Sequence, residues 1–435
     1  MKPSIHNIKH HVLSKLASVK SISVLIKVTI GVLISKAVAL FIGPVGFALI
    51  GNLENFVSAL HHMSVLGMYN TLVKYIGEFR DDLCKLSKLL STAFYIGYLS
   101  CVLISVLCYL NAETLNNLIF PIYNNYTYVI EVFAIALPFY AINMFSFAIL
   151  KGFSKYNTLL LINSIGQILS GLIALILIYQ TGIEGALISV VISESLIFLI
   201  TLVGIINRRS LSGLVKVNNI KFDFLKKIAP FSVMSLFSAV ILPLVALSIR
   251  SYIIDNLGYK EAGFWEAMNR ISRYYFMFGT ALMGYYVLPR LSKIDNVRVF
   301  WKAVLCCYKI LIPVFIVAAS GVYFSKSIIV SLIFSDEFSP VESLFFWQLL
   351  GDFMRALSLI MVSQFLVKKM FWHYLLTEIG LVIALYMFSI YYIDLYQDVN
   401  GAVMAHFVSY TIYFSIVVLV LTLSLFGADK RKLEV

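Results

Sequence analysis

Long apolar runs follow one another along almost the whole chain, separated by short polar connections. Each run can cross a bilayer as a helix, which takes roughly 20 apolar residues for about 30 Å of hydrocarbon. A transmembrane β-barrel would instead show short alternating segments. The pattern predicts an all-α polytopic membrane protein with twelve transmembrane helices, near residues 22–42, 46–66, 89–110, 128–150, 157–179, 184–206, 229–249, 265–288, 303–324, 344–366, 371–393 and 400–426.

The composition supports this prediction. Of the 435 residues, 60% are hydrophobic and only 13% are charged, which is more apolar surface than a soluble core can bury. The net charge of +12 would suggest nucleic acid in a soluble protein, whereas here Lys and Arg are expected to mark cytoplasmic connections. We therefore expect no nucleic-acid partner. The sequence has no P-loop and no CxxC spacing, so neither ATP hydrolysis nor a metal or other cofactor is predicted.

The distribution of basic residues predicts the orientation. If the N-terminus is cytoplasmic, 25 Lys and Arg residues fall in inside segments, against Arg250, Lys260 and Lys326 outside. The positive-inside rule then favours an even number of spans with both termini in the cytoplasm. The N-terminal segment is polar and basic without a small-residue cleavage site, so we interpret it as retained.

A basic cytoplasmic linker near the middle divides the chain. The predicted parts are an N-terminal segment 1–21, a six-helix bundle 22–206, the linker 207–228, a second six-helix bundle 229–426 and a tail 427–435.

A faint internal repeat accompanies this division. Gly46-Phe47 and Gly263-Phe264 each open the second span of their half, and Asn52 and Asn269 follow six residues after the glycine. Two pseudo-symmetric bundles related in this way are one of the known transporter plans.

Charged side chains at membrane depth are the candidate functional residues, because each costs at least about 2.5–3.5 kcal/mol at mid-bilayer. They should pair or line a wet cavity. The basic candidates for substrate binding are Lys27, Lys36, Arg270, Arg273 and Arg355. The acidic candidates for coupling or charge pairing are Glu54, Glu194, Glu266, Asp352 and Glu378.

Four of these charges form two pairs, each within one predicted helix. Glu266 and Arg270 are four residues apart, and Asp352 and Arg355 are three apart, so each pair can meet on one face. Such pairs could equally serve only to neutralise each other. Arg273 has no obvious acidic neighbour. The surplus of positive charge suits an anionic substrate such as a pyrophosphate head group, to which Arg offers bidentate donors.

Three stretches resemble a known family. Residues 27–75 resemble the start of Wzx-type flippases, such as O-antigen translocases and enterobacterial common antigen (lipid III) flippases, in the Lys-x8-Lys spacing of the first span and in the Gly-Pro-x-Gly turn. Residues 346–380, with Trp-Gln-Leu, Gly-Asp and Leu-Thr-Glu, and residues 285–293 are similar to the same proteins. These proteins belong to the multidrug/oligosaccharidyl-lipid/polysaccharide exporter (MOP) superfamily.

The resemblance implies a fold and a function. It implies two six-helix bundles around a central cavity and no catalytic activity. The implied substrate is an oligosaccharide linked to undecaprenyl pyrophosphate, flipped from the cytoplasmic to the periplasmic leaflet of the bacterial inner membrane by alternating access. Independently of the resemblance, the surplus of positive charge leads us to expect that Lys36, with Arg270 or Arg273, receives the pyrophosphate. Partners would be membrane lipids and the polymerase and chain-length proteins of the same pathway, and a monomer suffices.

The resemblance also assigns roles to particular charges. It implies that Lys27, Lys36, Asp352 and Glu378 are cavity charges. At the position of Arg355, the relatives have a residue of similar charge. The cluster of Glu266, Arg270 and Arg273 departs from the family pattern, which would adapt the site to a different sugar.

Two other functions are compatible with the same pattern. One is a drug or metabolite cation antiporter of the same fold, although its cationic substrates would favour an acidic cavity. The other is a membrane polymerase or ligase acting on lipid-linked sugars. That activity needs a sizeable outside loop with catalytic groups, and the longest predicted outside connections, near 111–127 and 325–343, are short.

Overall fold

The structure is a computed structural model that describes residues 19–121, 124–206, 215–282, 297–367 and 370–433. Within these ranges all regular secondary structure is helical. The residues predicted as 1–18 of the N-terminal segment, and the family-like stretch 285–293, lie outside the described residues.

The chain divides into two compact units. Unit 1 comprises Met1–Phe41 and Phe56–Val240, and unit 2 comprises Ile42–Asn55 and Ile241–Val435. Two helices belong to both units, because α3 (Pro44–Ser64) starts in unit 2 and α10 (Phe222–Leu257) starts in unit 1. The bundle boundaries proposed from the sequence stay a prediction.

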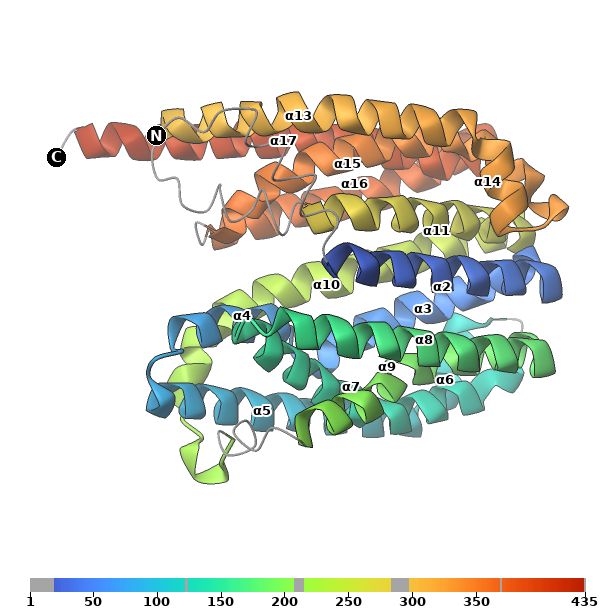
Figure 1. The fold of residues 1–435 in the computed structure, drawn as a ribbon. Coiled ribbons are helices and arrows are strands. Elements are labelled where there is room, and N and C mark those ends of the chain that lie inside the picture. The colour runs from blue at the N-terminus through green and yellow to red at the C-terminus, as the bar shows by residue number, and fades with distance from the viewer. Residues whose placement is uncertain (1–18, 122–123, 207–214, 283–296, 368–369, 434–435) are drawn as a thin grey trace. The chain divides into compact units, whose positions relative to one another are not determined.

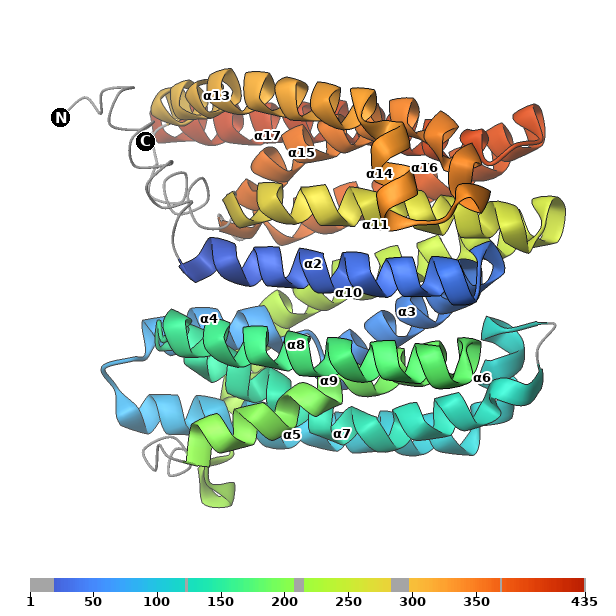
Figure 2. The ribbon, with the colours of Figure 1, turned by 45° about the vertical axis from the view of Figure 1, so that its right-hand side comes forward.

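Unit 1 is built of long helices that pack lengthwise. Helix α8 lies along both α2 and α9, and α7 contacts both α5 and α9 (Figures 1 and 2). Besides its parts of α3 and α10, the unit contains α2 (Val19–Phe41), α4 (Met68–Glu78), α5 (Leu83–Leu110), α6 (Ala112–Ile119), η1 (Asn124–Tyr126), α7 (Thr127–Gly152), α8 (Tyr156–Thr181), α9 (Ile183–Ile206) and η3 (Val217–Asn219).

Among the described elements, unit 2 repeats part of the order of unit 1: a long helix, a short helix, a 3-10 segment and then three long helices. Helix α17 packs against α15 and α16, and α11 and α13 both contact α15. The elements are α11 (Tyr259–Leu282), α13 (Val297–Phe324), α14 (Lys326–Ile333), η5 (Asp336–Leu344), α15 (Phe345–Val367), α16 (Phe371–Tyr396) and α17 (Asn400–Leu433). In both units a helix of 28 residues precedes one of 8 residues and a 3-10 turn, which supports the internal repeat.

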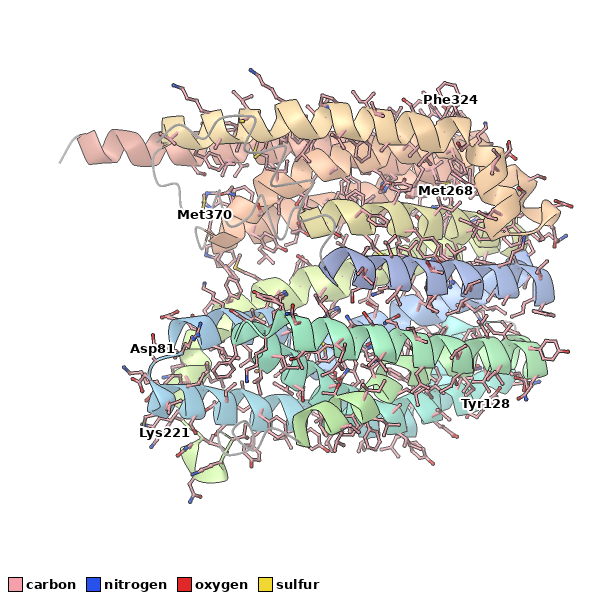
Figure 3. All side chains as sticks on the ribbon, viewed as in Figure 1. Asp81, Tyr128, Lys221, Met268, Phe324 and Met370 are labelled. Carbon is pink, nitrogen blue, oxygen red and sulfur yellow. The ribbon has the colours of Figure 1, made fainter. Side chains whose placement is uncertain are left out.

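Apolar side chains cover the outward surfaces of the helices (Figure 3). Leu99, Val317 and Phe324 are among the most exposed, at 71%, 73% and 85%. Such surfaces are stable in hydrocarbon and not in water. The chain is therefore a multi-span membrane protein.

Ten of the described helices are long and apolar enough to cross a membrane. Helices α3 and α11 have 21 and 24 residues but do not meet the same criterion of apolarity. These are the helices that carry Glu54 and the charges of the Glu266–Arg273 segment. The count of twelve spans stays a prediction.

The described part of the predicted linker is held against α5. The backbone N–H of Lys216 donates to Ser91 Oγ at 2.9 Å, and that of Lys221 donates to Thr92 Oγ1 at 3.0 Å. The Asn219 side chain donates to Ser87 Oγ at 2.7 Å. Residues 215–221 are thus a docked segment, which the basic composition of the linker did not indicate.

In unit 2, the start of α3 packs closely on α11. A Cβ built on Gly263 would lie 2.0 Å from the carbonyl oxygen of Pro44, so the approach requires a residue without a side chain. Next to it, the Phe47 ring packs edge-on against Phe334 and Phe338 of the η5 region, with centroids 5.4 and 5.1 Å apart. This packing fixes the register between α3 and α11, and the register positions the charges described below.

We expect Gly263→Ala to destabilise unit 2, since the new methyl overlaps the backbone of Pro44 and overpacking costs about 1–3 kcal/mol. The matched control is Gly380→Ala on α16, where a Cβ meets no atom within 4 Å. The control should be neutral or slightly stabilising, because Ala favours a helix over Gly by roughly 0.8–1.0 kcal/mol. Thermal unfolding in detergent measures both. Equal melting temperatures for the two variants would contradict the close contact.

Candidate functional site

Three arginines and two glutamates form a charged cluster within unit 2. Arg250 comes from α10, Glu266, Arg270 and Arg273 come from α11, and Glu54 comes from α3. The side chains of Arg250 and Glu266 are 1% and 0% exposed, whereas those of Glu54 and Arg273 are 33% and 46% exposed. The cluster therefore has a sealed inner end and an accessible outer end. We refer to these five residues as the arginine cluster.

The sealed end is held by Glu266. Its carboxylate forms an ion pair with Arg250 and accepts a hydrogen bond from Arg273 Nη2 at 2.6 Å. It also accepts from Arg270 Nε at 3.3 Å. Arg250 donates further to Asn52 Oδ1 at 3.3 Å. The three guanidinium partners thus offset the free-energy cost of removing this carboxylate from water.

The outer end is held by Glu54. Arg270 Nη2 donates to Glu54 Oε1 at 2.5 Å, and Arg273 Nη2 donates to Glu54 Oε2 at 3.3 Å. Arg270 is enclosed between both carboxylates with 6% of its side chain exposed. Arg273 reaches the same two carboxylates through Nη2, and nearly half of its side chain remains accessible.

The helix geometry explains why these groups meet. Positions 266, 270 and 273 on α11 follow the spacing of one helix face. Gly51 brings α3 against the same face: a Cβ built there would lie 2.8 Å from Arg250 Cζ and 2.9 Å from Glu266 Cδ. Any larger residue at position 51 would push α3 away from the buried ion pair.

The arginine cluster has an uncancelled positive charge. Arginine stays protonated in proteins, so three guanidiniums face two carboxylates when both acids are ionised. The accessible part of this charge lies on Arg273. An anion can therefore be bound there without leaving any buried charge unpaired.

The structure corrects two inferences from the sequence. The Glu266–Arg270 pair is present, but Arg273, for which no acidic neighbour was found, contacts both Glu54 and Glu266. The sequence places Arg250 in an outside connection after a span, whereas in the structure it belongs to α10 and its side chain is buried. The predicted span ended at residue 249, where the apolar run is interrupted. The helical spacing of Ile249, Ile253 and Ile254, all buried, is the signal that the helix continues.

A second buried site in unit 2 surrounds Asp352. The carboxylate is fully buried and lies 4.0 Å from Arg355 Nη1, so the predicted pair is present, but at the limit of an ion pair. Its closer partners were not predicted. Ser272 Oγ at 2.5 Å and Tyr275 Oη come from α11, and His406 Nε2 at 3.2 Å comes from α17. Gln348 Nε2, at 3.3 Å, lies one turn earlier on α15 itself.

The remaining candidate residues are distributed over both units. In unit 2, buried Glu378 accepts a hydrogen bond from Tyr413 Oη at 2.5 Å. In unit 1, Lys27 on α2 is an electrostatic partner of Glu194 on α9, and Lys36 is half-buried on α2. Among the described residues no group of three or more His, Cys, Asp or Glu side chains could hold a metal ion.

Similarity to known proteins extends over almost the whole chain. Two lipid III flippases, from Escherichia coli (strain K12) and Shigella flexneri, are each 25% identical over 403 residues, covering 91% of this chain and 94% of the relative. A solved structure of a multidrug resistance MATE family transporter of the MOP superfamily, in its inward-facing conformation, matches with a TM-score of 0.76 and 14% identity, covering 93% and 96%. No protein-family model matches the chain.

These similarities define the class of protein. The fold is that of MOP superfamily transporters, with two pseudo-symmetric helical bundles. Within this class the resemblance to a Wzx-type flippase, predicted from the sequence, is confirmed. The relatives and the structural neighbour bear the names of flippases and of a transporter.

We expect Glu266→Gln to destabilise the protein strongly, because it leaves Arg250 buried without a carboxylate. Breaking a buried pair by removing one partner costs about 3–5 kcal/mol. Glu54→Gln is the matched control, since Glu54 is one-third exposed and its loss is partly compensated by water. Thermal unfolding in detergent should show the larger loss for Glu266→Gln. A Glu266→Gln variant as stable as Glu54→Gln would contradict the role of Glu266.

Proposed function

We propose that this protein flips an oligosaccharide linked to undecaprenyl pyrophosphate from the cytoplasmic to the periplasmic leaflet of the bacterial inner membrane, by alternating access and with both termini in the cytoplasm. The lipid III flippase relatives support the substrate class. The observation that carries the proposal is the uncancelled positive charge of the arginine cluster, which suits an anionic head group.

Arg273 is the residue that we propose to receive the pyrophosphate. It is the most exposed arginine of the cluster, and its guanidinium can offer two parallel donors to phosphate oxygens. Its contact with Glu54, at 3.3 Å, is longer than its 2.6 Å contact with Glu266. An arriving pyrophosphate would therefore replace Glu54, while Glu266 keeps Arg273 in position. Arg270 is too enclosed for this role, and Lys27 and Lys36 on α2 stay candidates for further contacts with the head group.

The substrate explains why a protein is needed. Its polyprenyl tail is soluble in the bilayer, but bringing each polar group of the head through hydrocarbon costs several kcal/mol. Protein donors that replace water remove most of that cost. The pyrophosphate also experiences the membrane potential, which is worth about 2.3 kcal/mol per charge per 100 mV. Because the cell interior is negative, the export of an anion is favoured.

We predict that membrane potential alone drives flipping. In proteoliposomes, an inside-negative potential of 100 mV should favour outward flipping of a doubly charged pyrophosphate by about 4.6 kcal/mol. The fixed charges of the protein return in each cycle and contribute nothing. Potential and pH gradient should be imposed separately by potassium and buffer gradients. Flipping that follows only the pH gradient would contradict this mechanism and favour proton antiport through Glu54, Glu194 or Glu378.

We predict that Arg273→Gln slows flipping by at least about tenfold, the effect of losing one charged hydrogen bond of roughly 1.5–3 kcal/mol. Arg273→Lys should recover part of the rate, because it keeps the charge but loses the planar fork. The matched control is Arg80→Gln, at an exposed turn before α5, which should flip at the normal rate. An Arg273→Gln protein as active as the control would remove Arg273 from the proposed site.

A cation antiporter is the second candidate, because the MATE neighbour is a multidrug resistance transporter. The positive charge of the arginine cluster argues against cationic substrates, which need uncancelled carboxylates. Vesicle efflux of a cationic dye, measured beside the flipping assay, separates the two functions: efflux without flipping would favour the antiporter.

A further inference from the structure

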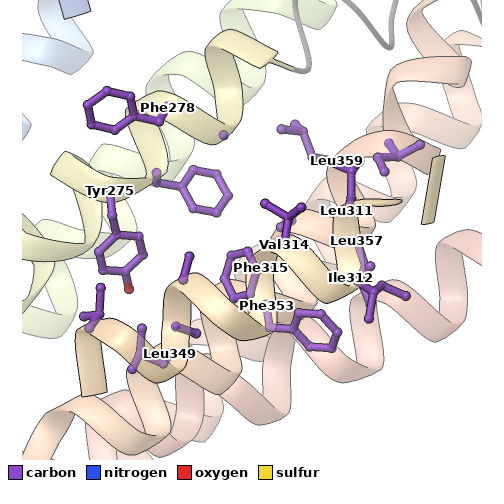
Figure 4. A pocket seen from close by; sticks show the side chains of 17 residues that line it. Tyr275, Phe278, Leu311, Ile312, Val314, Phe315, Leu349, Phe353, Leu357 and Leu359 are labelled. Carbon is purple, nitrogen blue, oxygen red and sulfur yellow. The ribbon is translucent and has the colours of Figure 1, made fainter. Parts of the chain in front are cut away.

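Helices α11, α13 and α15 of unit 2 enclose an apolar pocket (Figure 4). Its empty volume is about 960 Å³, counting the part that opens to the surface. Of the 17 residues that line it, only Tyr275 carries a polar side-chain group, and the Tyr275 hydroxyl donates to Asp352. The pocket is therefore suited to a hydrocarbon and not to sugar or water.

The pocket opens at the outer surface of the unit. Val314 on α13 and Phe278 on α11, both in its lining, are 57% and 36% exposed. Gly279 adds to the opening, since a Cβ built on it would meet no atom within 4 Å. An apolar opening of this kind is stable against hydrocarbon and not against water. A lipid chain can enter the pocket through this opening.

A guanidinium lies directly beside the apolar lining. Arg355 Cζ is 4.6 Å from the ring centroid of Phe276, a lining residue. The Arg355 side chain is 40% exposed, and its nearest carboxylate oxygen, on Asp352, is 4.0 Å away. Arg355 can therefore donate to an anion while remaining stacked on Phe276.

Helix α11 connects the pocket to the arginine cluster. Arg273 precedes the lining residue Phe276 by three positions and Gly279 by six, which is about 4.5 and 9 Å along a helix. One helix thus presents a cation first and an apolar pocket next. This order matches a lipid whose anionic head is joined to a hydrocarbon chain.

We propose that the pocket holds the isoprenoid units next to the pyrophosphate of the transported lipid, with Arg355 and Arg273 on the side of the head group. This inference rests on the proposed function. Two guanidiniums near one apolar pocket suit the doubly charged pyrophosphate at the head of a polyprenyl chain. Because lipid tails are as apolar as the lining, moving the tail from the bilayer into the pocket gains no hydrophobic free energy. It guides the tail while the head group is bound.

Photolabelling of the full-length protein in nanodiscs tests the inference. The probe is undecaprenyl pyrophosphate with a diazirine on the isoprene unit nearest the pyrophosphate. We expect label in residues 311–322 of α13 and its loss in Gly279→Leu, whose side chain fills the pocket. Gly321→Leu is the matched control on α13: its Cβ also meets nothing within 4 Å, and Gly321 is not part of the lining. The control should keep the label.

The alternatives give different results. Undiminished label in Gly279→Leu, or equal labelling by a phosphatidic acid that carries the same diazirine, would overturn the inference and make the pocket an ordinary lipid site. Flipping by the unmodified protein without label in α13 would also overturn it, and would leave the proposed function standing. Absence of flipping would overturn the proposed function itself.

Discussion

The buried ion pair between Arg250 and Glu266 is the interaction on which unit 2 depends. A guanidinium cannot become neutral to escape a low-dielectric interior, so a fully buried arginine requires a permanent carboxylate. That carboxylate, on α11, is in turn shared with Arg270 and Arg273. Ion pairs and hydrogen bonds of this cluster thereby hold α3, α10 and α11 together. Gly51 permits α3 to approach the Arg250 and Glu266 side chains closely.

The same interaction makes an accessible cation tolerable in a membrane protein. A lone arginine at membrane depth is costly, but Glu266 and Glu54 hold Arg273 while leaving much of its side chain accessible. The helices that carry these charges, α3 and α11, are the ones too polar to qualify as spans by hydropathy. Each occupies the second position of its half in the repeated order of elements. Polarity that weakens insertion is concentrated in the two helices that, under the proposed function, face a polar substrate.

The sequence predicts the fold better than the site. Apolar runs and short connections predict a helical membrane protein, because hydrocarbon permits few other structures. Pairs within one helix, such as Glu266 with Arg270, follow from helical spacing alone. Partners from different helices do not: Glu54 lies 216 residues before Arg270, and His406 lies 54 residues after Asp352. Arg250 was missed because hydropathy marks where an apolar run ends, not where a helix ends.

The central claim is that the surplus charge of the arginine cluster receives a phosphorylated head group. The most direct test is an experimental structure of the protein with undecaprenyl pyrophosphate bound. The account predicts phosphate oxygens about 2.7–2.9 Å from the guanidinium nitrogens of Arg273, with Glu266 still in contact and Glu54 displaced. A pyrophosphate bound elsewhere, with Arg273 still held by both carboxylates, would contradict it.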